Sequence, residues 1–231
     1  MFPSSHCTVC NHKLGPLELI PVFSFLIQGG KCKNCKAKIS WYYTIFELLT
    51  GILFLLSYLR FGFTYTCFLS LSLSSILIII IISDYKYYII PDELIIAGII
   101  LIGISKFLIG GGAISNFAWI EALKSLILSL ANGMYSFLLM YAVKLFGDFL
   151  FKKESMGGGD IKLMFLIGMT LGFPLSIITI FVASIIGLPI ALVLLKLKST
   201  HEIPFGPFLS VATLVLFFIN CNWKDILMLL A

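Results

Sequence analysis

Long apolar runs separated by short polar segments make up most of this sequence after residue 40. Four of the runs, at residues 42–59, 65–83, 93–109 and 122–146, come close to the roughly 20 residues that a helix needs to cross a bilayer. Few charged residues interrupt them. The pattern therefore predicts four membrane-spanning helices in this part of the chain.

The next apolar run, residues 161–195, is too long for one span. Gly172-Phe173-Pro174 divides it, and because glycine and proline interrupt helices we expect a short helix followed by a longer one. A last run, residues 205–219, predicts a further span, with Trp223 as an interfacial anchor. Residues 41–231 are therefore predicted to form an all-α polytopic membrane domain of about seven transmembrane helices. A loop is expected at residues 147–159.

The amino-acid composition agrees with a membrane protein. Of the 231 residues, 60% are hydrophobic and only 12% are charged, about half the charged fraction of a soluble domain. The net charge of +5 does not indicate a nucleic-acid partner, because the lysines stand in short loops between apolar runs. That placement is typical of cytoplasmic loops in membrane proteins. The expected partner of the apolar helices is the lipid bilayer.

The distribution of positive charge predicts the topology. Placing the lysine-rich N-terminal segment in the cytoplasm and alternating the spans puts most lysines on the cytoplasmic side. The lysines on that side are Lys13, Lys31, Lys33, Lys36, Lys38, Lys86, Lys144, Lys152, Lys153, Lys162, Lys196 and Lys198. Arg60, Lys106 and Lys224 depart from the pattern. The same assignment puts Asp84 and Asp160 at the cytoplasmic face, so these two carboxylates are expected to meet.

Residues 1–40 form a polar segment with two C-x-x-C pairs, Cys7 with Cys10 and Cys32 with Cys35. Four thiolates at this spacing suit a tetrahedral zinc site, and disulfides are not expected in a cytoplasmic segment. We therefore expect a structural Zn²⁺, because so small a polar module cannot be held together by burial alone. The alternatives are two independent redox pairs, or reduced thiols without metal.

The stretch between the two cysteine pairs, residues 17–27, is apolar. It is too short to span a bilayer. It is therefore expected to pack on the membrane surface or against the other helices.

Asp84 and Asp160 are the candidate catalytic residues. Each stands at the edge of an apolar run, where a carboxylate is costly and is by default a functional candidate. Two such groups that meet suggest an aspartyl hydrolase, in which the pair shares a proton and activates water. Gly157, Gly158 and Gly159 precede Asp160 and would let a peptide backbone approach, because glycine has no Cβ. The alternative is a flexible loop before a helix, with Asp160 as the N-cap.

Two further motifs have sufficient structural explanations. Asp92 follows Pro91 at the start of the third span, where a carboxylate is favoured by the positive end of the helix dipole. Pro204-Phe205-Gly206-Pro207 bends the chain at the entry to the last span, and these residues alone indicate no role in catalysis. The sequence contains no H-E-x-x-H zinc motif and no phosphate-binding loop.

Two other classes of protein remain open on these residues. An ion- or proton-coupled transporter would use intramembrane carboxylates, and a helix broken at residues 172–174 fits such a protein, although we find no inverted repeat. A non-catalytic assembly protein, with zinc as a docking element, would tolerate the loss of Asp84.

In their order along the chain, these motifs resemble those of the bacterial type IV prepilin peptidases, the prepilin leader peptidase/N-methyltransferase family. The resemblance rests on the two C-x-x-C pairs around Leu19-Ile20-Pro21, Gly30-Lys31-Cys32, Glu47-Leu48, Asp84 with Pro91-Asp92, residues 156–163 and residues 204–207. It implies a membrane aspartyl endopeptidase of pilus, type II secretion or competence systems, similar to presenilin in its Gly-x-Gly-Asp segment. Asp84 and Asp160 would be the catalytic pair, and the four cysteines would bind the metal.

The resemblance also implies a class of substrate and a cellular location. Family members usually cut pilin-like precursors after a glycine, at the cytoplasmic face of the bacterial inner membrane. They usually begin with another transmembrane helix, which carries a Gly-Ser-Phe-Leu-Asn-like segment. This sequence begins at Met1-Phe2-Pro3, so we expect a trimmed chain or a short form. Because the N-terminal part is associated with N-methylation from S-adenosylmethionine, we expect the peptidase activity first, and methyl transfer only if it survives without that helix.

Overall fold

The computed structural model describes residues 5–112, 117–152, 154, 156–197 and 204–219. The chain folds into two compact units, Met1–Leu56 and Ser57–Ala231. The helix α2 (Trp41–Phe61) begins in the first unit and ends in the second. Within the described ranges the regular elements are all helical, which confirms the predicted fold class.

Five helices in the described part of the chain are long and apolar enough to cross a membrane. They are α2, α3 (Tyr65–Tyr87), α4 (Asp92–Gly111), α5 (Trp119–Phe151) and α7 (Phe173–Leu197). Two more apolar helices, α6 (Gly158–Leu171) and α8 (Gly206–Ile219), have 14 residues each. These seven helices correspond to the seven predicted from the apolar runs. The predicted interfacial anchor at Trp223 lies outside the described residues.

The expected loop at residues 147–159 was wrong in its first part, because α5 continues through Phe151 and has 33 residues. A lone glycine such as Gly147 costs a helix only about 1 kcal/mol, and no proline follows it in this stretch. The helix ends where Lys152 adopts a left-handed conformation, with φ of 53°. At about 50 Å in length, α5 is longer than the hydrocarbon core is thick.

The predicted break at residues 172–174 is confirmed. Gly172 ends α6 in a conformation with φ of 88°, which favours glycine, and its N–H donates to the Gly168 carbonyl at 2.9 Å. Pro174 falls in the first turn of α7, where a missing N–H removes no helical hydrogen bond. The long apolar run is thereby divided into a short helix and a long one.

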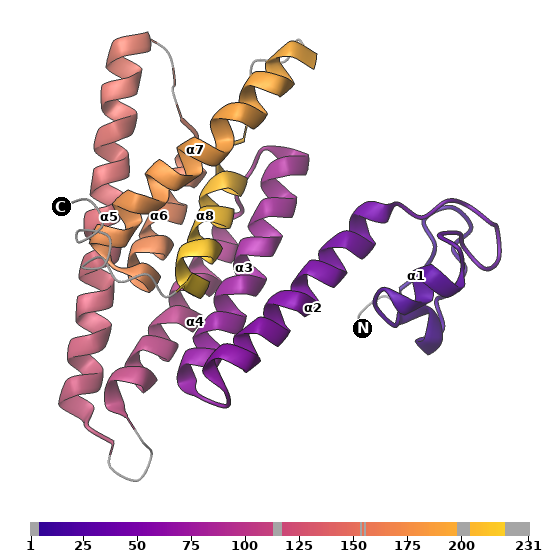
Figure 1. Cartoon of the computed structure of the whole chain (residues 1–231), viewed down its shortest axis with the longest axis horizontal. Coiled ribbons are helices and arrows are strands. Elements are labelled where there is room, and N and C mark those ends of the chain that lie inside the picture. The colour runs from indigo at the N-terminus through magenta and orange to yellow at the C-terminus, as the bar shows by residue number, and fades with distance from the viewer. Residues whose placement is uncertain (1–4, 113–116, 153, 155, 198–203, 220–231) are drawn as a thin grey trace. The chain divides into compact units, whose positions relative to one another are not determined.

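Within the second unit, α6 packs against α4, α5, α7 and α8. Leu163, Met164, Leu166 and Ile167 on this helix are completely buried. A Cβ on Gly168 would lie 2.6 Å from the Asn132 carbonyl oxygen of α5, so glycine lets the two helices approach closely, as small residues do between membrane helices. Figure 1 shows α8, in yellow, beside α3 and α7, and α8 contacts both. The short helix that carries Asp160 is therefore held in a packed core.

The first unit contains two turns with the same backbone pattern, one for each cysteine pair. An isolated bridge between His6 and Lys13 encloses the first pair, and one between Lys31 and Lys38 encloses the second. In each turn the first cysteine N–H donates to a carbonyl five residues later, Cys7 to His12 and Cys32 to Ala37, both at 2.9 Å. The repeated pattern brings the two pairs of thiols together.

Candidate active site

Asp84 lies near the end of α3 and is only 6% exposed. The helix ends at Tyr88, which adopts a left-handed conformation and donates its N–H to the Asp84 carbonyl at 2.9 Å. The Ser83 hydroxyl donates to the Ile89 carbonyl at 2.8 Å and holds the turn that follows. The chain therefore folds back immediately after Asp84, towards the start of α4.

Asp160 lies in the first turn of α6 and is 8% exposed. Gly157 is the N-cap of this helix, so Asp160 is not, and Gly158 and Gly159 already belong to the helical turn. Of the three glycines, only Gly157 remains in the connecting segment. The first turn of a helix favours a carboxylate, because unpaired N–H groups and the helix dipole present positive charge there.

The structure brings Asp84 and Asp160 together beside Gly206, the first residue of α8. A Cβ built on Gly206 would lie 2.5 Å from Asp84 Oδ2 and 3.3 Å from Asp160 Oδ1. The two carboxyl oxygens therefore lie close to a single point on the α8 backbone. The Gly206 N–H faces the Asp84 carboxylate. Three helix ends, those of α3, α6 and α8, meet at this site.

Ile90 closes one side of the site and is 8% exposed. Its Cβ lies 2.9 Å from the position that a Cβ on Gly159 would take, and its Cδ1 lies 3.1 Å from the corresponding position on Gly206. An apolar side chain placed here keeps water away from the carboxylates, which strengthens electrostatic interactions between them. Sequence reasoning missed both Ile90 and Gly206. For Gly206, the available signal was a glycine between two prolines at the start of an apolar run.

An ion pair links the segments that carry the two aspartates. Lys162 Nζ of α6 lies 2.6 Å and 2.8 Å from the two carboxylate oxygens of Asp92, which begins α4. Asp92 is in the first turn of its helix, as predicted. Its pairing with Lys162 could not be predicted, because the two residues are 70 positions apart in the chain.

The four cysteine sulfurs predicted to bind metal form one cluster in the first unit. All four Sγ atoms lie within 4.8 Å of one another, with Cys7 3.9 Å from Cys35 and Cys10 4.0 Å from Cys32. Sulfurs bound tetrahedrally at about 2.3 Å from a zinc ion would be about 3.8 Å apart. The cluster therefore fits a zinc-binding site.

The thiols of the cluster differ in acidity. Hydrogen bonds from the N–H groups of Cys10 and Val9 lower the pKa of the Cys7 thiol to about 6, against the opposing effect of burial. At Cys35 the Ala37 N–H lowers the pKa, but burial and hydrogen bonds with the other three cysteines together raise it to about 11. Four thiolates held this close would repel one another, and a metal cation bound between them would offset that repulsion.

Two family models match this chain. A family model described as the bacterial peptidase A24 N-terminal domain matches residues 1–61, and the model of the type IV leader peptidase family matches residues 71–192. No solved structure matches the chain.

Several relatives carry the name prepilin leader peptidase/N-methyltransferase. The relative from Pseudomonas aeruginosa is 32% identical, over 92% of this chain and 70% of its own length. The relative from Bacillus subtilis is 34% identical, over 92% and 80%, and that from Neisseria gonorrhoeae is 34% identical, over 98% and 75%. The matches and the apolar helices together establish an integral membrane protein that belongs to the type IV leader peptidase family.

Proposed function

We propose that this protein is a membrane-embedded aspartyl endopeptidase that removes the leader peptide from type IV pilin-like precursors. The observation that carries the proposal is the pair of buried carboxylates, Asp84 and Asp160, which both lie close to Gly206. The names of the relatives supply the substrate class. The relatives are bacterial proteins, which supports the bacterial inner membrane as the location of this protein. The lysine distribution predicts that the site faces the cytoplasm.

The proposed mechanism uses the two carboxylates in different protonation states. Two carboxyl groups held close together in a low-dielectric site do not both ionise readily, so the pair retains one proton. The ionised member takes a proton from a water molecule, which attacks the scissile carbonyl. The protonated member donates a hydrogen bond to the carbonyl oxygen and stabilises the negative charge that develops there.

The neighbours of the pair suit a peptide substrate. Of Gly157, Gly158 and Gly159, the first two leave space beside Asp160: a Cβ on Gly158 would meet no heavy atom within 4 Å, and one on Gly157 would meet only Asp160 Oδ2, at 3.9 Å, whereas Gly159 packs against Ile90. An extended backbone can therefore come close to the carboxylates. A pilin-like precursor, with an apolar helix in the bilayer and a polar leader outside it, would present its cleavage site at this depth.

The function is tested with the purified full chain in detergent and a type IV pilin precursor that retains its leader. We expect a shortened product on a gel, and mass spectrometry should locate one cut between the leader and the apolar helix. A folded protein that leaves the precursor intact would contradict the proposal. A transporter or a non-catalytic assembly protein would give that negative result.

Zinc binding by the four cysteines is a second part of the proposal. The ion would supply structural support, with Cys7, Cys10, Cys32 and Cys35 as ligands, since closed four-cysteine sites leave no position for a substrate. We expect elemental analysis of the purified protein to find one zinc ion per chain. Cys32→Ser should remove most of the zinc and lower the melting temperature, whereas Cys67→Ser, at a buried and isolated cysteine of α3, should keep it. Equal zinc contents in these two variants would refute the assignment.

The ion pair between Lys162 and Asp92 is expected to position the catalytic segments. Both side chains are half-exposed, so the pair contributes at most about 1 kcal/mol to stability. Lys162→Ala and Asp92→Ala should each slow cleavage by about two- to tenfold, and the double variant should be no slower than the worse single one. Initial rates on the same precursor measure this. Additive effects of the two substitutions would show that the residues act separately.

The relatives are also named N-methyltransferases, and we propose the same second activity for this chain, with S-adenosylmethionine as the methyl donor. The name shared by the relatives supports it. The processed pilin should then carry one extra methyl group at its new N-terminus when the donor is present. Mass spectrometry of the cleaved product tests this. A product with the same mass with and without the donor would contradict the methyltransferase activity.

A further inference from the structure

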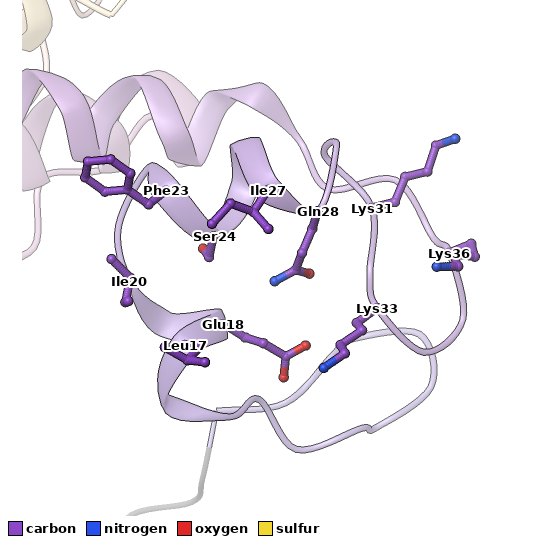
Figure 2. Close-up of a pocket in the computed structure, with 10 residues that line it drawn as sticks. All are labelled: Leu17, Glu18, Ile20, Phe23, Ser24, Ile27, Gln28, Lys31, Lys33 and Lys36. Atoms are coloured by element: carbon purple, nitrogen blue, oxygen red, sulfur yellow. The ribbon is translucent and has the colours of Figure 1, made fainter.

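A cleft of about 460 Å³ opens in the first unit, and none of the four clustered cysteines lines it (Figure 2). Its two sides differ in chemistry: the picture shows Leu17, Ile20 and Phe23 along one side, and lysines along the other. The three lysines that line it are Lys31, Lys33 and Lys36. The cleft therefore offers an apolar wall and a cationic wall to the same occupant.

The apolar wall extends into an exposed surface. The side chains of Leu17, Phe23 and Ile27 are 78%, 66% and 84% exposed. The neighbouring Leu19, Ile20 and Leu26 are exposed as well. We call these six side chains the apolar patch. A cluster of large apolar side chains on so small a module marks a surface that contacts another apolar phase.

The position of the patch along α2 indicates which phase that is. The N–H of Val22, which precedes Phe23, donates to the Glu47 carboxylate of α2 at 2.9 Å. The ring of Phe25 packs edge-on against Trp41, with centroids 4.6 Å apart. The patch therefore lies level with the first two turns of α2.

Those first turns belong to the membrane span. With 21 residues, α2 is about 31 Å long, which is only just enough to cross a hydrocarbon core of about 30 Å. A span needs at least about 17 residues, so at most about one turn of α2 can stand clear of the bilayer. A segment packed beside Glu47 is therefore at the depth of the headgroups and the adjoining acyl chains.

We propose that residues 16–28 form an interfacial anchor that binds anionic phospholipid. The apolar patch inserts into the leaflet that α2 enters at Trp41, and Lys31, Lys33 and Lys36 bind the headgroup phosphate in the cleft. Lysines above an apolar surface are typical of segments that lie in the interface.

The carboxylate in the cleft does not oppose an anionic ligand. Glu18 accepts a hydrogen bond from the Gly15 N–H at 2.8 Å, and His12 lies 3.5 Å from the same oxygen. The Gly15 N–H, the His12 ring and the charge of Lys33 lower the pKa of Glu18. Glu18 therefore stays ionised, and three lysines against this one carboxylate leave the cleft with a net positive charge.

The full chain reconstituted into nanodiscs tests this proposal. The variant Phe23→Trp reports the depth of the patch, because bromine atoms on lipid chains quench tryptophan fluorescence at short range. The fluorescence of the new tryptophan is obtained by subtracting the wild-type fluorescence from that of the variant. We expect strong quenching of Trp at position 23, and stronger quenching when the brominated lipid is anionic phosphatidylglycerol instead of phosphatidylcholine. The matched control is Val9→Trp, an exposed site in the first cysteine turn, which should remain unquenched.

The charge requirement is tested in the same discs. Each lysine near an anionic surface contributes about a fivefold preference for that lipid, so Lys31→Gln with Lys36→Gln should lower the preference by about 25-fold. Lys144→Gln with Lys152→Gln, at the end of α5, is the matched control and should not change it. Quenching at position 23 no greater than at position 9 would overturn the proposal, as would equal quenching by both lipids. If the tryptophan at position 23 becomes shielded from solvent only after a pilin precursor is added, the apolar patch is a protein-docking surface. That result would also overturn the lipid proposal.

Discussion

Replacing Asp84 or Asp160 by asparagine should abolish cleavage, with the rate falling by about 10⁴-fold or more. Asparagine has nearly the same shape as aspartate but cannot donate or take up the catalytic proton. Because both side chains lie in a packed site, at 6% and 8% exposure, the isosteric change should leave the fold intact. The rate is measured on a pilin precursor under conditions of excess enzyme, so that slow residual cleavage is detected.

The control for both variants is Glu93→Gln, which removes an exposed carboxylate from the first turn of α4 and should cleave at close to the wild-type rate. Melting in detergent should show all three variants folded. Since the two aspartates act as one unit, the double variant should be no slower than either single variant. A rate above about one tenth of the wild-type value in Asp84→Asn or Asp160→Asn would rule out the two-carboxylate mechanism.

The sequence was sufficient to predict most of the helices. Apolar runs long enough to span a bilayer leave few alternatives to a helix, and Gly172 and Pro174 mark the break between α6 and α7. Helix ends were less certain at α5, because nothing between Gly147 and Phe151 forbids another helical turn. The cysteine cluster was also predictable, since two C-x-x-C turns impose the geometry of four ligands locally.

The proximity of the two aspartates followed from topology, not from periodicity. α3 is apolar all the way round, so its sequence does not indicate which face is buried. Placing Asp84 and Asp160 at the same membrane face required only the alternation of spans and the lysine distribution. Gly206 could not be found this way, because its importance comes from the two carboxylates that lie beside it in space.

Gly206→Ala is expected to slow cleavage by about 10²-fold or more while the protein remains folded. The added methyl group would lie 2.5 Å from Asp84 Oδ2 and 3.3 Å from Asp160 Oδ1, so at least the Asp84 carboxylate must move. A displacement of about 1 Å in a catalytic group costs about 10²-fold in rate. Alanine lowers the conformational entropy of the unfolded chain relative to glycine, which favours folding by about 0.4–1 kcal/mol and offsets part of the loss of stability caused by the clash. Cleavage rate and melting temperature, measured on the same preparation, separate the two effects.

Gly51→Ala is the matched control, because a Cβ at this position in α2 meets no heavy atom within 4 Å; it should keep the wild-type rate. A second comparison identifies the contact responsible. Ile90 Cδ1 also lies 3.1 Å from the new methyl group, and Ile90→Val would relieve that contact alone. Gly206→Ala combined with Ile90→Val should stay slow, because the clash with Asp84 remains. Recovery of the rate in the double variant would show that Ile90, and not the carboxylate pair, requires glycine at the start of α8.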